Sequence, residues 1–207
     1  MDLPLILGQP AGPDPLRCYT PAEELALTTN LQAIAGAIHR GEYVGLRHDL
    51  DLLCSIHERL FGSVRDHAGR IRRRGYGSER LTFGPHRSFH RDEVEAGLDR
   101  VFTSLDRSIR SLDANPDAPE YETSAIHLAA WTHAEVIRVH PFEDGNGRSS
   151  RALMNSILVR QGLRPVAVEA TKEEYIGVLN HFIKTSDILP LRDLYIRLMA
   201  EQIPNGN

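Results

Sequence analysis

The chain has 207 residues, of which 41% are hydrophobic and 25% are charged, and its formal net charge at pH 7 is −4. This composition is typical of a globular protein with one substantial core, and the acidic balance argues against a general nucleic-acid binder. The two cysteines, Cys18 and Cys54, match no metal or redox spacing, so we interpret them as buried or incidental thiols, which fits a reducing cytosol.

The first 19 residues contain four prolines, and we interpret them as an arm that precedes a single domain over residues 20–203. Residues 1–7 carry no basic cluster, and their apolar run is too short for a signal peptide or a membrane span. We therefore expect a cytoplasmic protein without membrane association. Delivery into another cell by a specialised secretion system, which needs no such signal, stays open.

Apolar residues recur at helical spacing in several segments and predict a mostly α-helical bundle without internal repeats. The predicted helices cover residues 20–38, 46–60, 92–112, 123–139, 147–161, 173–184 and 190–202. The first has a clear start, because the Thr20 hydroxyl precedes Pro21 and two carboxylates of the first turn.

The segment between the second and third helices is rich in arginine and glycine. Residues 70, 72, 73 and 74 are all arginine, and we interpret this cluster as a solvated face, with a target or phosphate contact as the alternative. A short β-prone run, residues 80–83, is followed by Gly84 and Pro85. This pattern is typical of a hairpin, although a plain connecting loop also fits it.

Two histidines lie on predicted helices away from any motif. His57 is followed by Glu58, but no second histidine stands at zinc-site spacing, so we expect a surface pair. His133 shares a helix face with Ile137, and we interpret it as a packed residue rather than a ligand.

The densest chemistry lies in residues 140–151, which read His-Pro-Phe-Glu-Asp-Gly-Asn-Gly-Arg-Ser-Ser-Arg. Pro141 disfavours helical geometry in the residue before it, so the helix should end there and His140 should be extended. Gly145 and Gly147 lack side chains, so the backbone N–H groups between them can approach an anion closely.

A helix that begins near Gly147 would direct its free N–H groups at the same anion. Arg148 and Arg151 share a face of that helix, and guanidinium groups suit a polyphosphate because they bind its oxygens bidentately. Asp144 suits Mg²⁺, which bridges carboxylate and phosphate oxygens, and His140 suits a general base. Together these residues predict phosphoryl or nucleotidyl transfer.

Residues 140–151 resemble the signature of the Fic family, His-x-Phe-x-Asp/Glu-Gly-Asn-Gly-Arg-x-x-Arg, at every specified position. Residues 66–69, Asp-His-Ala-Gly, resemble a second Fic landmark that precedes an arginine, although His67 stands where tryptophan is usual. The looser resemblance extends over about residues 45–200. It implies a Fic-type helical bundle with a short β-hairpin flap near the active site, which holds the target by strand addition.

The resemblance implies a protein adenylyltransferase, which transfers AMP from Mg-ATP to a Ser, Thr or Tyr hydroxyl of a target protein. It also implies the site residues. These are His140 as general base, Asp144 as the Mg²⁺ ligand, Gly145, Asn146 and Gly147 as the phosphate-binding anion hole, Arg148 and Arg151 at the distal phosphates, Phe142 as the anchor of the loop in the core, and Leu81, Thr82 and Phe83 as the flap.

Two alternatives stay open: a Fic-fold transferase with another nucleotide or phosphate donor, and a toxin-like module that binds a nucleotide without turnover. Many Fic proteins are inhibited by the glutamate of a Ser/Thr-x-x-x-Glu-Gly/Asn pattern. The nearest match here runs from Thr20 to Glu24 and is followed by Leu25. Either a separate antitoxin-like partner supplies the glutamate, or this restraint is absent.

Overall fold

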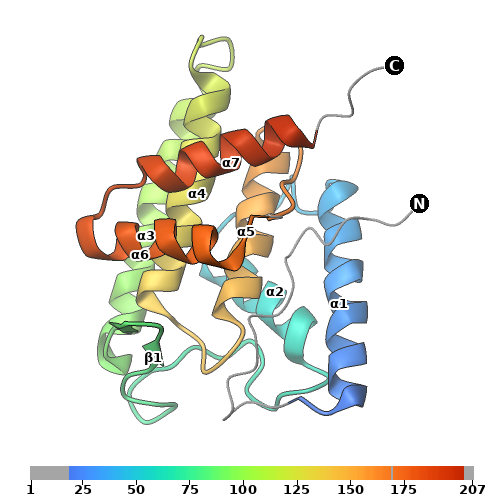
Figure 1. The fold of residues 1–207 in the computed structure, drawn as a ribbon, viewed down its shortest axis with the longest axis vertical. Helices are drawn as coiled ribbons and strands as arrows, with labels where there is room; N and C mark the ends of the chain where they lie inside the picture. The colour runs from blue at the N-terminus through green and yellow to red at the C-terminus, as the bar shows by residue number, and fades with distance from the viewer. Residues whose placement is uncertain (1–18, 169, 203–207) are drawn as a thin grey trace.

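The computed structural model describes residues 19–168 and 170–202, which form seven α helices and one two-stranded hairpin (Figure 1). The elements are α1 (Pro21–His39), α2 (Leu50–Phe61), β1 (Thr82–Phe83), β2 (His86–Arg87), α3 (Arg91–Asp113), α4 (Tyr121–Val139), α5 (Asn146–Arg160), α6 (Lys172–Thr185) and α7 (Leu189–Glu201). The predicted mostly helical fold with one short hairpin is confirmed. The predicted domain limits reach into residues 1–18 and 203, outside the described part, and stay a prediction.

The capping residues decide where the first two helices begin. At α1, the Thr20 hydroxyl accepts the N–H of Glu23, and the Glu23 carboxylate accepts the N–H of Thr20 at 2.8 Å, which is a complete capping box. At α2, Asp49 is extended and its carboxylate accepts the N–H of Leu52 at 3.1 Å. The helix predicted from residue 46 therefore begins four residues later, because the cap outweighs the apolar periodicity.

Helix α4 runs through the middle of the bundle and packs against α3, α5, α6 and α7, while α5 also packs against α1 and α2. Small residues on α4, among them Ala129, Ala130 and Ala134, are buried and let its neighbours approach closely. Every residue of α5 from Ser149 to Leu158 is buried. Among the described helices, none has both the length and the apolar character needed to cross a bilayer.

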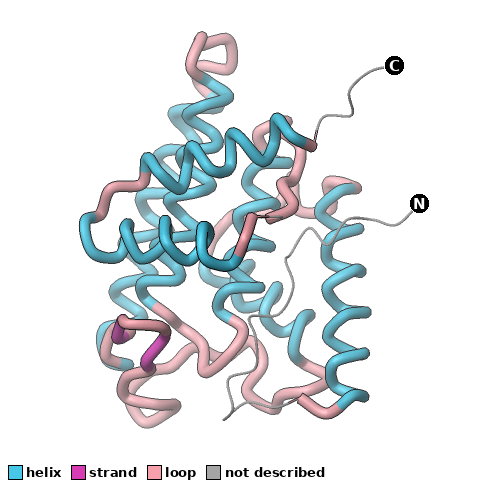
Figure 2. Tube along the Cα trace, in the orientation of Figure 1, coloured by secondary structure: helices cyan, strands magenta, loops and turns pink. Residues whose placement is uncertain are grey.

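The loops that carry the predicted chemistry gather at one end of the bundle. Figure 2 shows the α4–α5 loop, the hairpin and the long segment that leads to it at the same end, close to the start of α1. Segments far apart in the sequence are therefore brought together around residues 140–145 (Figure 1).

The hairpin is shorter than the β-prone run that predicted it. Thr82 pairs with Arg87 and Phe83 with His86, and Gly84 takes a left-handed φ of 53° in the turn. Strands of two residues have little stability of their own, so contacts with the rest of the protein must hold the hairpin in place.

The thiol of Cys54 lies partly buried on α2, and burial raises its pKa to about 11. It is therefore protonated at neutral pH and a poor nucleophile or metal ligand. This agrees with an incidental thiol. Cys18 lies outside the described residues.

Candidate functional site

The loop between α4 and α5 begins at His140, whose backbone is left-handed, with φ 56° and ψ 63°. The extended conformation predicted from Pro141 is therefore wrong. The His140 N–H donates to the carbonyl of Val136, and its own carbonyl accepts from Arg72, from Nε at 3.0 Å and from Nη2 at 2.6 Å. A left-handed non-glycine residue costs about 1–3 kcal/mol, which charged hydrogen bonds of this kind can offset.

The imidazole of His140 lies against the hairpin. Its Nδ1 is 3.3 Å from the carbonyl oxygen of Ile137, and a carbonyl can only accept a hydrogen bond. The proton of the neutral ring therefore belongs on Nδ1, and the lone pair belongs on Nε2. The Phe83 ring stacks on the imidazole at a centroid distance of 4.2 Å and an interplanar angle of 8°. A side chain of the predicted flap thus covers one face of the predicted base.

A side-chain amide closes the loop from inside. Asn146 is 3% exposed, its Nδ2 donates to the Phe142 carbonyl at 2.8 Å, and its Oδ1 accepts the Phe142 N–H at 2.9 Å. The Asn146 side chain is therefore engaged within the loop. The donors that the predicted anion hole can offer to a phosphate are therefore backbone N–H groups at the start of α5. The first N–H groups of a helix have no acceptor within the helix itself.

Position 145, just before α5, requires glycine for two reasons, its backbone conformation and the side chain that lies against it. Its φ is 76°, and a Cβ atom at this position would lie 2.2 Å from the Phe61 ring. The loop can therefore lie on the aromatic ring beneath it only with glycine here.

His57 is fully buried beneath this loop, so the predicted surface pair is wrong for His57, while Glu58 is exposed. The ring stacks between Phe61 and Phe142, at centroid distances of 4.7 and 3.8 Å. Its Nδ1 accepts the N–H of Gly69 at 2.9 Å, so Nε2 carries the proton and donates to the Asp144 carbonyl at 3.0 Å. Burial lowers the pKa of His57 to about 4, which keeps the ring neutral.

The carboxylate of Asp144 accepts the Gly145 N–H at 2.6 Å and the hydroxyl of Tyr19, the residue just before the cap of α1. Arg148 Nη2 donates to the same Tyr19 hydroxyl at 2.9 Å, and its guanidinium lies 4.5 Å from the centre of the Phe61 ring. Burial, followed by the hydrogen bond to Asp144, raises the pKa of Tyr19. Tyr19 thus joins the predicted metal ligand to a predicted phosphate ligand, a contact that no sequence pattern indicated.

Arg151 lies one turn further along α5 and is 9% exposed. Its Nη1 donates to the Tyr175 hydroxyl of α6 at 3.3 Å. That hydroxyl also lies 2.6 Å from Nε2 of His133, which is fully buried, so the prediction of a packed histidine is confirmed. The two predicted phosphate ligands therefore start from one helix but contact different parts of the protein, Tyr19 before α1 and Tyr175 of α6.

The predicted arginine cluster divides into two kinds of residue. Arg70, Arg73 and Arg74 are exposed, but Arg72 is fully buried, so the solvated-face interpretation is wrong for Arg72. Its carbonyl acceptors lie more than 60 residues away at the end of α4, as well as in the segments beside the hairpin. Such distant partners cannot be read from local composition.

The Fic/DOC family model matches residues 47–158 of the chain, more than half of its length. The protein belongs to the Fic/DOC family. Its predicted site residues 140–151 all lie within the matched segment, as do the hairpin and Arg72. The family resemblance inferred from the sequence is thereby confirmed.

Relatives named protein adenylyltransferase Fic match a limited part of this Fic/DOC chain. The relative from Nematostella vectensis is 40% identical over 79 residues, which are 36% of this chain and 17% of the relative. The relative from Drosophila persimilis is 36% identical over 77 residues, which are 37% of this chain and 14% of the relative. The chain thus spans less than a fifth of the length of these curated relatives.

Solved Fic structures share the fold. The Fic domain of Bep8 from Bartonella sp. 1-1C has a TM-score of 0.71 at 14% identity and covers 90% of this chain and 88% of its own. BepC from Bartonella tribocorum, solved with bound AMPPNP, has a TM-score of 0.61 at 16% identity, with coverages of 83% and 86%. These similarities show that the predicted Fic-type fold is correct.

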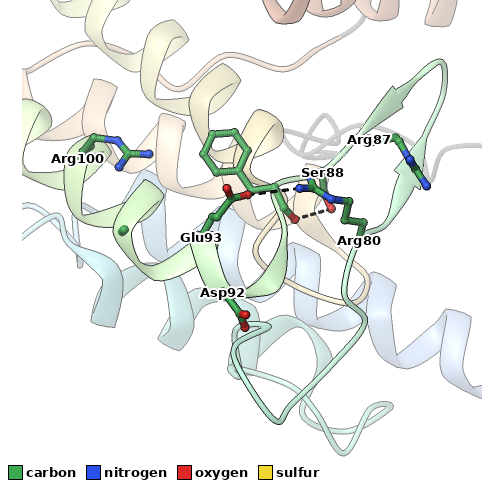
Figure 3. Close-up of a pocket in the computed structure, with 8 residues that line it drawn as sticks. Arg80, Arg87, Ser88, Asp92, Glu93 and Arg100 are labelled. Atoms are coloured by element: carbon green, nitrogen blue, oxygen red, sulfur yellow. Dashed lines mark hydrogen bonds and ion pairs between the residues drawn. The ribbon is translucent and has the colours of Figure 1, made fainter.

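A shallow pocket beside the hairpin lies apart from the Fic motif. It is lined by Arg80, Arg87, Ser88, Phe89, Asp92, Glu93, Ala96 and Arg100 (Figure 3). Arg80 donates to the Ser88 carbonyl at 2.9 Å and lies 3.6 Å from Glu93. Because no residue of 140–151 lines this pocket, we assign the site to the motif loop instead.

The donors around the motif fit a metal ion that is shared with a nucleotide. Among the described residues, no three His, Cys, Asp or Glu side chains converge as a metal cage. Mg²⁺ in nucleotide sites is commonly held by one or two carboxylates together with phosphate oxygens. Asp144, a partly buried carboxylate beside the start of α5, fits that arrangement.

We expect the stability of the protein to fall as the pH is lowered, because His57 and His133 are buried as neutral rings. Burial lowers their folded pKa values to about 4 and about 3, whereas a histidine of the unfolded chain titrates near 6.5. Below pH 6.5 the unfolded chain therefore binds protons that the folded chain does not. The free energy of unfolding should fall by up to about 1.4 kcal/mol per pH unit for each histidine, until the folded pKa is reached.

Urea unfolding at about pH 7.5 and about pH 5 measures this slope. His133→Gln should reduce it by the share of one histidine, whereas His39→Gln, at an exposed position, should keep the wild-type slope. Equal slopes for the wild type and His133→Gln would contradict the assignment.

Proposed function

We propose that this protein is a protein adenylyltransferase, which transfers AMP from ATP to a hydroxyl side chain of a target protein. The observation that carries the proposal is the arrangement around one loop. An imidazole with its lone pair on Nε2, a carboxylate, a helix N-terminus and two arginines belong to the same loop–helix unit. The names of the curated relatives and the AMPPNP bound in BepC support a nucleotide as the second substrate.

In the proposed reaction, Nε2 of His140 takes the proton of the target hydroxyl as its oxygen attacks the α-phosphorus of ATP. A new oxygen–phosphorus bond forms, the bond to the β-phosphate oxygen breaks, and pyrophosphate leaves. The N–H groups at the start of α5 and the guanidinium of Arg148 stabilise the charge on the phosphates. Asp144 would hold Mg²⁺, which supplies further charge neutralisation when bound.

The hairpin is the proposed contact for the target protein. Phe83 stacks on the proposed base, so a target strand that adds to the hairpin edge would bring its hydroxyl beside His140. Leu81, Thr82 and Phe83 would therefore act on the target more than on ATP.

His140→Ala tests the proposal directly. The variant should keep its fold and its nucleotide affinity but lose at least about 100-fold in transfer, since general base catalysis contributes about 10²–10⁴-fold. Labelled ATP with a cell lysate, followed by mass spectrometry of the labelled protein, measures the transfer and the transferred group. Unchanged labelling would remove His140 from the mechanism, and another mass would indicate another donor. Wild-type binding of ATP without any labelling would indicate a module without turnover.

Replacement of Leu81, Thr82 and Phe83 by glycine should weaken labelling of the target while leaving ATP affinity similar, because Thr82 and Phe83 form β1 of the hairpin and Leu81 directly precedes it. Calorimetry with ATP and labelling of the identified target separate the two effects. Glu95→Gly, at an exposed position of α3, is the control for a general loss of stability. An equal loss of ATP affinity and labelling would mean that the hairpin serves the fold alone.

Tyr19→Phe should lower the KM for Mg-ATP by about tenfold. The Tyr19 hydroxyl bonds to Asp144 and Arg148, the two side chains that the metal and the phosphates would need. A hydrogen bond to a charged group contributes about 1.5–3 kcal/mol, and about 1.4 kcal/mol corresponds to a factor of ten. Glu24→Gly, at an exposed position of α1, should leave the KM unchanged. A higher KM for Tyr19→Phe would place its hydroxyl among the nucleotide contacts instead.

A further inference from the structure

We propose that Arg72, which lies outside the Fic motif, is a positioning residue that fixes the backbone of His140 and the hairpin as one unit. The inference rests on the proposed function, because it concerns the alignment of the proposed base with the proposed target contact.

The guanidinium of Arg72 is fully buried where three segments of the chain meet. The side chain makes six nitrogen-to-oxygen contacts below 3.5 Å, and all six end on backbone carbonyls. The acceptors are the carbonyl oxygens of Ser78 at 3.1 Å, Glu79 at 3.4 Å, Phe89 at 3.3 Å, Val139 at 3.4 Å and His140 at 2.6 and 3.0 Å. One side chain therefore bonds to the end of α4 and to both segments that flank the hairpin.

The positive charge of Arg72 is suited to a buried site that is lined by carbonyl oxygens. A buried cation costs several kcal/mol unless its donors are satisfied, so an arginine in the core needs a specific set of acceptors. The last carbonyls of α4 form the negative end of the helix dipole, which favours a cation there. A guanidinium carries five N–H donors on three nitrogens, and Arg72 uses all three nitrogens, whereas an ammonium carries three donors on one nitrogen, so lysine would not be equivalent.

The backbone of His140 needs this support. A left-handed conformation is costly for histidine, and in the residue before proline it is further restricted. The two bonds from Arg72 to the His140 carbonyl favour this conformation over the extended one. The direction of the imidazole follows from the backbone, so Arg72 would set where Nε2 points.

The hairpin is connected to the same unit by two further contacts. Glu143 of the motif accepts the Ser78 N–H at 2.5 Å and the Ser78 hydroxyl at 2.8 Å, and Phe83 stacks on His140. Asp144 and Arg148 are held by different residues, His57 and Tyr19. Loss of Arg72 should therefore disturb the transfer step and leave nucleotide binding in place.

Arg72→Lys and Arg72→Gln test the inference, with Arg74→Gln, exposed in the same cluster, as the control. With ATP saturating, both Arg72 variants should lose about 100-fold in kcat, the scale expected for a misplaced catalytic group. Their ATP affinity by calorimetry should stay within about twofold, and Arg74→Gln should match the wild type. The wild-type rate should level off at high pH, while the Arg72 variants should continue to rise as hydroxide replaces the misaligned base.

A measurement that does not require AMP transfer tests the role of Arg72 independently of the proposed function. The stacked Phe83 ring should shift the His140 ring proton signals in an NMR spectrum. The Phe83→Leu variant lacks this ring, so comparison with the wild type identifies the shift. Arg72→Lys should abolish the shift while the signals of the distant His133 stay unchanged. Wild-type kcat, or an unchanged His140 signal in Arg72→Lys, would overturn the inference. Loss of the His133 signals as well would show that Arg72 serves the fold alone. Absence of AMP transfer in the wild type would overturn only the proposed function.

Discussion

The stack of Phe61, His57 and Phe142 is the interaction on which the site depends. It fills the space between α2 and the motif loop with three aromatic rings, and the middle ring also bonds to the Asp144 carbonyl. Gly145 lies directly on Phe61, so the loop has one position in which its backbone and this stack fit together. The stack therefore orients the start of α5, and with it the N–H groups and arginines proposed to bind phosphates.

Two kinds of contact hold the loop: buried side chains bond to its backbone carbonyls, and the Tyr19 hydroxyl bonds to the charged side chains of Asp144 and Arg148. His57 and Arg72 bond to the carbonyls of Asp144 and His140, so the shape of the loop is fixed through its main chain. Arg148 bonds to the hydroxyl of Tyr19. A phosphate oxygen can replace a neutral hydroxyl at modest cost, because the hydroxyl brings no opposing charge. The backbone of the loop is thus held rigidly, while the Tyr19 hydroxyl on Arg148 can be replaced by a phosphate oxygen.

Periodicity and capping chemistry predicted the helices because both depend on neighbours within about four residues. The motif predicted which residues carry the chemistry, and the structure brings them to one loop. The errors at His57, Arg72 and His140 share a cause, since each of these residues has a deciding partner that lies 68 or more residues away in sequence. One signal was available for His57. It lies between Leu53 and Leu60 on the apolar face of α2, where burial is expected for any residue type.

Because the hairpin is short, binding of a target protein to it would be coupled to the position of His140. Strands of two residues cannot hold a fixed position alone, so the place of the hairpin is set by its contacts. These contacts are Arg72 and Glu143 at its base, Phe83 on the His140 ring, and His86, which lies 2.8 Å from Asn180 of α6. Three of the four involve the motif loop or its backbone. A target strand that adds to the hairpin would therefore bind an element whose position already depends on the base, so recognition and alignment would be coupled within one structural unit.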